Sequence, residues 1–208
     1  MDITYLGAGS VKLAGKNLNV VCDPFDASFG LGKVNAKADV VVHTGPDGYS
    51  TIDGAKVFDS PGEYEVKGAT LTGVPARLHI DEEGHRGTAY SVVVDGINVV
   101  VTGNIAGKLD EDQIENLGQV DVLVVPVGGH GLTLDAEGAA AVVTQLEPTY
   151  VVPVHYDDKN TTYPMPQDGV EKFLKEMGVS PEPESKLRIT SSEPSAETQV
   201  VLLTRAGS

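Results

Sequence analysis

Residues 38–50 read ADVVVHTGPDGYS, and the rest of the chain is organised around this stretch. A run of three valines, typical of a buried β-strand, passes directly into a polar loop rich in glycine. A strand that ends in such a loop is a common way to present functional side chains at the edge of a sheet. We therefore expect the residues after Thr44 to lie at the functional site.

Turn signals separate short β-forming runs throughout the first half of the chain. The pair Asp95-Gly96 lies between two β-branched runs, which is the strongest short-range signal for a β-hairpin. The segment DVLVVPV at residues 121–127 is continuously apolar, so we expect a strand that is covered on both faces. A similar apolar strand is expected at residues 150–154.

Helices are predicted only in the second half, where they alternate with these strands. Residues 110–117 begin with Asp110 and have Gln113 three positions later, which is the spacing of a capping box. The other predicted helices are residues 135–146 and 168–177, the last with Asp168 and Glu171 at the same spacing. The pattern predicts an α/β (α+β) fold, with helices outside a sandwich of sheets, formed by residues 1–208 as a single domain.

The balance of charge excludes several classes of partner. Fifteen basic and thirty acidic residues give a formal net charge of −15, so nucleic acid and anionic membranes are not expected as partners. Cys22 is the single cysteine, which excludes an intrachain disulfide. The N-terminal residues lack the basic head and apolar core of a signal peptide, so we expect a cytoplasmic protein. The composition is compatible with a homo-oligomer.

Several segments of the chain, in the order in which they occur, resemble segments of a known family. The most specific are SPGEYEVKG at residues 60–68, VVPVGG at 124–129 and EPTYVVPVHY at 147–156. Together they resemble the metallo-β-lactamase superfamily, and within it the L-ascorbate-6-phosphate-lactonase-like branch of small metal-dependent hydrolases. The resemblance implies a four-layer αββα sandwich with its site at one edge of the paired sheets.

The resemblance also implies a site for two metal ions, usually zinc. The family holds them with a T-H-x-H-x-D-H loop, a His in an early turn, a His after a G-V-P strand, a bridging Asp and a His in P-x-H-Y. Without gaps, Thr44 matches the Thr of the loop. The remaining family ligand positions then fall on Ala8, Gly45, Asp47, Tyr49, Ser50, His79, Asn104 and His155.

Most of these residues are poor substitutes for zinc ligands. Glycine has no side chain, hydroxyl groups bind zinc weakly beside imidazole, and the amide of Asn104 brings no bridging negative charge. A second alignment shifts the loop by two residues, with His43 as the first ligand and Asp47 as the aspartate. We expect the dinuclear centre to be lost and no cofactor to be bound. One weakly bound zinc ion at Asp47, His79 and His155, with or without His43, remains an alternative.

Each candidate also has a purely structural interpretation. His155 would hydrogen-bond at the end of its strand, His79 would be a solvated surface residue, and Asp47 would stabilise a turn.

Three functional hypotheses follow. The first, which we favour, is a degenerate metallohydrolase that acts as a binding or scaffold protein. The second is a hydrolase with one metal ion that acts on a small phosphorylated or lactone-like substrate. The third is a metal-free pocket, at the former active site, for a small polar ligand.

Overall fold

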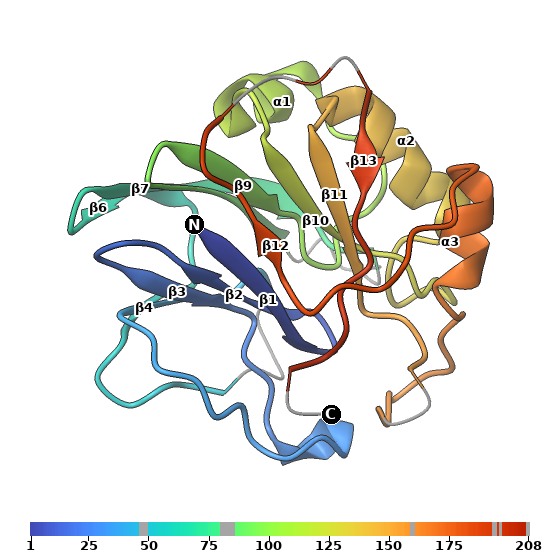
Figure 1. Cartoon of the computed structure of the whole chain (residues 1–208), viewed down its shortest axis with the longest axis horizontal. Coiled ribbons are helices and arrows are strands. Elements are labelled where there is room, and N and C mark those ends of the chain that lie inside the picture. The colour runs from blue at the N-terminus through green and yellow to red at the C-terminus, as the bar shows by residue number, and fades with distance from the viewer. Residues whose placement is uncertain (46–49, 80–85, 159–160, 193–194, 196, 207–208) are drawn as a thin grey trace.

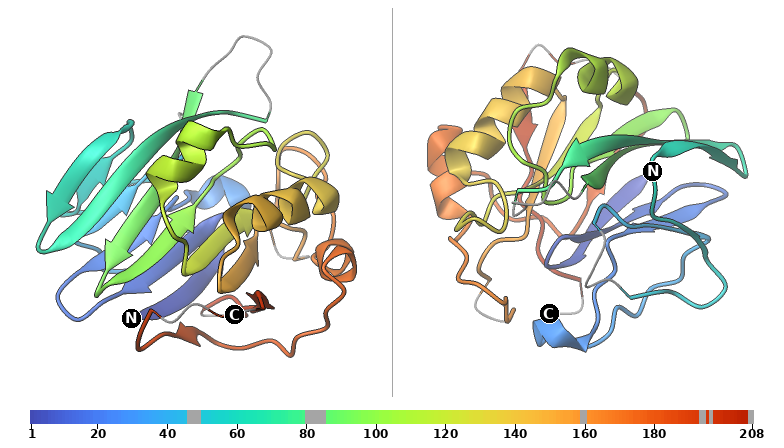
Figure 2. Two further views of the ribbon diagram at one scale, coloured as in Figure 1. Left: turned by 90° about the horizontal axis from the view of Figure 1, so that it is seen from above. Right: turned by 180° about the vertical axis from the view of Figure 1, so that it is seen from behind.

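The computed structural model describes residues 1–45, 50–79, 86–158, 161–192, 195 and 197–206. Its strands form two sheets that stack face to face (Figures 1 and 2). The six-stranded sheet has the order β12-β1-β2-β3-β4-β5, and the seven-stranded sheet has the order β13-β11-β10-β9-β8-β7-β6. Each sheet combines antiparallel and parallel pairs, so both are mixed. The predicted sandwich of two sheets is confirmed.

The bounds of the elements are as follows. The six-stranded sheet comprises β1 (Asp2–Gly7), β2 (Ser10–Ala14), β3 (Asn19–Cys22), β4 (Val40–Val42), β5 (Lys56–Phe58) and β12 (Leu187–Arg188). The seven-stranded sheet comprises β6 (Gly62–Val66), β7 (Ala69–Arg77), β8 (Arg86–Val94), β9 (Ile97–Val101), β10 (Val122–Pro126), β11 (Tyr150–Val154) and β13 (Gln199–Val200). The helices are η1 (Ala27–Phe29), α1 (Glu111–Leu117), α2 (Ala136–Leu146) and α3 (Glu171–Glu176).

The α-helices lie on the side of the seven-stranded sheet. Helix α1 contacts β7, α2 contacts β10, and α3 packs against α2 (Figure 1). The segment between β3 and β4 lies beside the six-stranded sheet, and the helical part of its described residues is the single short turn η1. No helix in the described part of the chain is long and apolar enough to cross a membrane.

Local sequence signals set two of the helix starts and the hairpin. Asp110 accepts from the backbone N–H of Gln113, whose side chain accepts in return from the N–H of Asp110, so the predicted capping box is present. Asp135 caps α2 through the N–H of Gly138. The hairpin turn uses Asp95 and Gly96 with φ of 55° and 79°, as a two-residue turn of the favoured twist requires.

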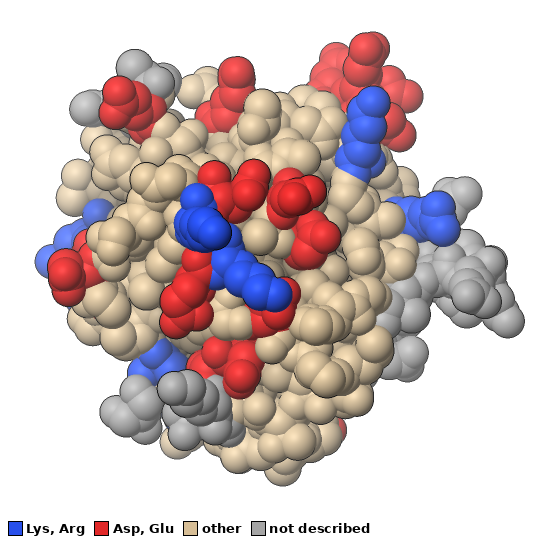
Figure 3. All heavy atoms as spheres, turned by 90° about the vertical axis from the view of Figure 1, so that its right-hand side faces the viewer, with Lys and Arg blue, Asp and Glu red and all other residues tan. Residues whose placement is uncertain are grey.

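The predicted start of α3 at Asp168 is wrong. The helix begins at Glu171 and its first residue has no side-chain cap. Asp168 instead accepts from His130 Nε2 at 2.9 Å and pairs with Lys172 Nζ, four positions later, at 2.7 Å. One distant and one local partner therefore engage the carboxylate in place of the backbone N–H groups at the helix start. Figure 3 views the molecule from the side on which α3 lies in Figure 1, and there acidic side chains surround a small group of basic ones.

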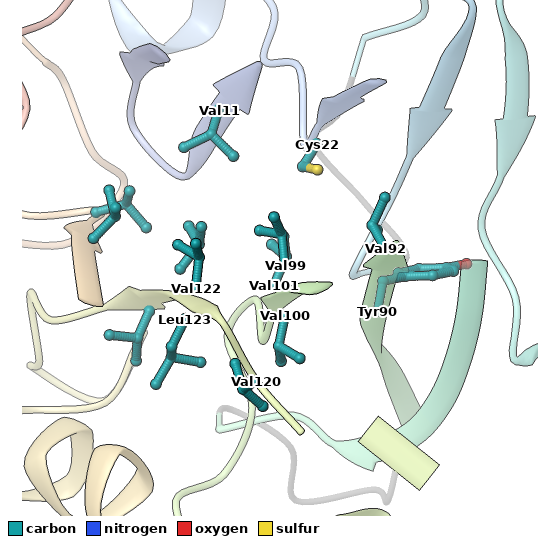
Figure 4. Close-up of a cluster of buried hydrophobic side chains, with 14 of the residues drawn as sticks. Val11, Cys22, Tyr90, Val92, Val99, Val100, Val101, Val120, Val122 and Leu123 are labelled. Carbon is teal, nitrogen blue, oxygen red and sulfur yellow. The ribbon is translucent and has the colours of Figure 1, made fainter. Parts of the chain in front are cut away.

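The core lies between the sheets and continues beneath the helices. Val11 and Cys22 from the six-stranded sheet point towards Val99 and Val122 of the seven-stranded sheet (Figure 4). Leu123 points the opposite way, towards the helices, and is fully buried. Every residue of β10 is buried, which confirms that this strand is covered on both faces.

The sheets also meet closely where β4 and β9 end. Gly103 has a φ of +60°, and a Cβ atom added there would overlap the side chain of Thr44. Gly96 has a φ of +79° but has open space around it.

We predict that Gly103→Ala lowers the free energy of unfolding by about 1–3 kcal/mol more than Gly96→Ala, because both strain the backbone but only the first overpacks a contact. Chemical denaturation of the two variants measures the difference, and equal losses would contradict it.

Candidate functional site

The candidate site lies where strands from both sheets reach their carboxyl ends. Strands β3 and β4 are parallel neighbours in one sheet, and β9, β10 and β11 are parallel neighbours in the other. Two backbone hydrogen bonds join the sheets at this edge, from Thr88 N to Thr44 O at 2.8 Å and from His155 N to Ala8 O at 2.7 Å. The carboxyl ends of parallel strands are a usual position for a ligand site.

A cavity of ≈ 220 Å³ occupies this edge. Its wall is mainly apolar, with polar side chains contributed by Asp23, Asn104 and His155. No Lys or Arg belongs to the described lining. The lining residues are Ala8, Gly9, Asp23, Phe25, Phe29, Val101, Gly103, Asn104, Val124, Pro126, Leu132, Val154, His155 and Pro164.

Phe25 and Phe29 line one side of the cavity, and Tyr163 packs against Phe29 from a separate segment. The rings of Phe25 and Phe29 lie 5.9 Å apart, Phe29 and Tyr163 are also 5.9 Å apart, and Tyr163 lies 4.6 Å from the His155 ring. The N–H of Thr162 donates to Phe29 O at 2.8 Å and fixes the two segments together. Closure therefore depends on residues more than a hundred positions apart in the sequence.

Asp23 holds the start of the loop that follows β4. Its carboxyl oxygens accept from Thr44 N and from Thr44 Oγ1, each at 2.7 Å. The side chain is 4% exposed, and burial raises the pKa of Asp23 to about 7 despite both hydrogen bonds from Thr44. A protonated carboxyl suits the same geometry, because it can donate to the hydroxyl oxygen of Thr44.

His155 is a buried, neutral imidazole at the end of β11. Burial lowers its pKa to about 4, against a small opposing effect of the hydrogen bond with Gln167. Nδ1 lies 3.3 Å from Gln167 Oε1. The Gln167 amide nitrogen donates to Pro166 O at 2.7 Å, which orients the side chain with its oxygen towards the ring.

Three lining residues that are not glycine adopt the left-handed backbone conformation. Ala8 has a φ of 47°, Asp23 of 46° and His155 of 53°. Such residues are uncommon and cluster at functional sites, where the surrounding structure holds a strained backbone in place. Each of the three directly follows a strand: Ala8 follows β1, Asp23 follows β3 and His155 follows β11. Their strained backbone therefore sets where these side chains meet the cavity.

The structure brings together some of the predicted site residues. Ala8, Asn104 and His155 all line the cavity, although they come from three different loops. They occupy the positions that the sequence resemblance matched to an early-turn His, a bridging Asp and the His of P-x-H-Y.

Other predicted residues lie outside the lining. His79 is exposed, although its backbone N–H donates to Asn104 O at 2.8 Å. His43 directly follows β4 and is buried, and its backbone N–H donates to Phe58 O. Gly45 follows Thr44 and is half-buried, and Ser50 Oγ donates to Phe25 O at 3.0 Å. Asp47 and Tyr49 lie outside the described residues, so the choice between the two alignments stays a prediction.

Sequence reasoning missed two residues of the site. Asp23 follows the apolar run of β3 in the segment VVCDPF, and an acid directly after a buried strand was a usable signal. Gln167 carried no such signal, because its partner His155 is 12 positions away across an irregular segment.

Comparison with known proteins identifies the family. The model of the β-lactamase superfamily domain matches residues 2–155. This chain belongs to the metallo-β-lactamase superfamily. A Thermus thermophilus protein named UPF0173 metal-dependent hydrolase is 29% identical over 202 residues, which cover 81% of this chain and 88% of that protein.

Solved structures agree with this family. A Thermotoga maritima protein titled as a Zn-dependent hydrolase of the metallo-β-lactamase superfamily has a TM-score of 0.80 and 28% identity, with 98% of this chain and all of that chain covered. Igni18, a metallo hydrolase from Ignicoccus hospitalis, has a TM-score of 0.64 at 21% identity, with 85% and 90% covered, and shows the shared fold alone. Relatives in the superfamily are thus named as metal-dependent hydrolases.

The described residues do not fit a dinuclear zinc centre. No group of three or more His, Cys, Asp or Glu side chains in the described part of the chain is placed to hold a metal ion. Around the cavity there is one imidazole, one amide and one carboxyl, and that carboxyl is already bound to Thr44. Zinc sites of this superfamily need several imidazole and carboxylate ligands that converge.

The buried carboxyl of Asp23 predicts a specific pH dependence of stability. Its pKa is about 7 in the folded protein, against the ordinary value of 3.8 for an aspartate side chain. The stabilising contribution of the protonated carboxyl is complete below pH 3.8 and is lost as the pH rises through 7. Asp23→Asn cannot titrate, so we predict that the unfolding free energy of wild type relative to this variant falls by a few kcal/mol (roughly 1.4 per pKa unit) between these limits.

Urea denaturation of both proteins at several pH values measures this change. The exposed substitution Asp53→Asn controls for the removal of one negative charge. If the free energy of unfolding changed with pH in the same way for wild type and Asp23→Asn, this would contradict the prediction that the carboxyl keeps its proton in the folded state.

Proposed function

We propose that this protein is a non-hydrolytic member of the superfamily that binds a small molecule in the cavity without a metal ion. The observation that carries the proposal is the set of polar groups around the cavity. The side chains of His155 and Asn104 are available to a ligand, whereas Asp23 is engaged with Thr44. One imidazole and one amide suit hydrogen bonding to a ligand better than they suit zinc coordination.

The residues at the other family ligand positions support the same proposal. Ala8 and Gly45 have no ligating side chain, and the hydroxyl of Ser50 is bound to Phe25 O. The cavity has an apolar wall with a few polar groups, which is typical of small-molecule sites. A binding role that retains the fold but not the chemistry is consistent with the general separation of fold and function.

A second candidate is favoured by the names of the relatives. Proteins that match most of this chain are named metal-dependent hydrolases. In that case one metal ion would use Asp47, His79 and His155, with or without His43, and the substrate would be small and phosphorylated or lactone-like. The lactonase-like branch, indicated by the segment at residues 60–68, remains a prediction from the sequence.

Metal content separates the two candidates. Protein purified without a tag or chelator is expected to contain far less than one zinc ion per chain by elemental analysis, and added zinc is not expected to raise its melting temperature. The Thermus thermophilus relative, prepared in the same way, serves as a control for loss of metal during purification. Tightly held zinc near one ion per chain would contradict the proposal and favour the hydrolase.

A further inference from the structure

The hydrogen bonds around Gln167 determine which nitrogen of His155 carries the proton. The Gln167 amide nitrogen donates to Pro166 O at 2.7 Å and to Met165 O at 3.4 Å. The amide oxygen therefore faces His155 Nδ1, 3.3 Å away, and can only accept. A neutral imidazole with hydrogen on Nδ1 has a bare lone pair on Nε2.

Nε2 is thus an acceptor at the wall of the cavity. His155 is only 6% exposed and lines the cavity, and Nδ1 is its single side-chain hydrogen-bonding atom with a partner among the described residues. An imidazole nitrogen in an apolar surrounding is costly to leave without a hydrogen bond.

The rest of the wall restricts the molecule that can supply this hydrogen bond. The volume of ≈ 220 Å³ lies below the usual size of drug-like sites, which is about 300–1,000 Å³. Phe25, Phe29 and Leu132 offer apolar contact. Without Lys or Arg in the described lining, and with a net charge of −15, the cavity disfavours an anion such as a phosphate or carboxylate.

We propose that the cavity selects a small, neutral molecule with an apolar body and a hydroxyl or N–H group that donates a hydrogen bond to His155 Nε2. Gln167 is the positioning residue that fixes this acceptor. The inference rests on the proposed metal-free binding function and adds the chemical class of the ligand. Asn104 lines the same cavity and offers its amide to the ligand's own oxygen or nitrogen.

Phenol and anisole test this selection as a matched pair, because they differ by the methyl group that removes the donor. Titration by calorimetry is expected to show phenol binding at least about tenfold more tightly than anisole, because phenol can donate a hydrogen bond to Nε2 and anisole cannot. Phenyl phosphate is expected not to compete. Equal affinities for phenol and anisole would overturn the selection for a donor but leave a binding cavity in place.

Nitrogen NMR of the intact protein reads the tautomer directly. Long-range ¹H–¹⁵N spectra of His155 are expected to show protonated Nδ1 and bare Nε2, and phenol is expected to shift the Nε2 resonance. A ring with hydrogen on Nε2 would overturn the inference. Stoichiometric zinc binding at Nε2 would instead overturn the proposed function, so the two failures are distinguishable.

Variants of Gln167 test its positioning role. Gln167→Leu removes the acceptor for Nδ1–H, so the ring is expected to populate the other tautomer and to lose the preference for phenol over anisole. Gln167→Glu keeps an acceptor at the same place and is expected to restore both. An unchanged tautomer and preference in Gln167→Leu, with an unchanged melting temperature, would overturn the role of Gln167.

Discussion

The hydrogen bonds between the carboxyl of Asp23 and Thr44 are the interaction on which the functional edge of this protein depends. They fix the backbone at the point where β4 turns into its loop. Thr44 in turn accepts from Thr88 and sits against Gly103, both of which belong to the opposite sheet. One buried carboxyl therefore aligns the ends of strands from both sheets, and the cavity lies between those ends.

The same scaffold that would hold metal ions also suits a site without them. His155 is placed by the strand end and by its bond to Ala8, and neither interaction requires a metal. The described lining holds one imidazole, one amide and one carboxyl bound to Thr44, and its apolar wall favours groups that keep their hydrogen bonds and avoid charge. A neutral imidazole oriented by Gln167 satisfies both conditions.

Much of the fold was predictable because its signals are local. The capping box of Asp110 and Gln113 and the Asp95-Gly96 turn each involve residues within a few positions of one another. The buried strand β10 was visible as an unbroken apolar run. The start of α3 was not predictable, because the tertiary contact of Asp168 with His130 and its ion pair with Lys172 compete with the capping role that its spacing indicated.

By itself the sequence determined the family, and residue types such as Gly45 and Asn104 limit what any geometry at those positions can coordinate. Only the tertiary structure decided how the cavity at this site is formed. The cavity, the packing of Phe29 against Tyr163 and the position of His155 Nδ1 beside Gln167 arise from contacts between separate segments. Such contacts depend on how the two sheets stack, so no local pattern in the chain encodes them.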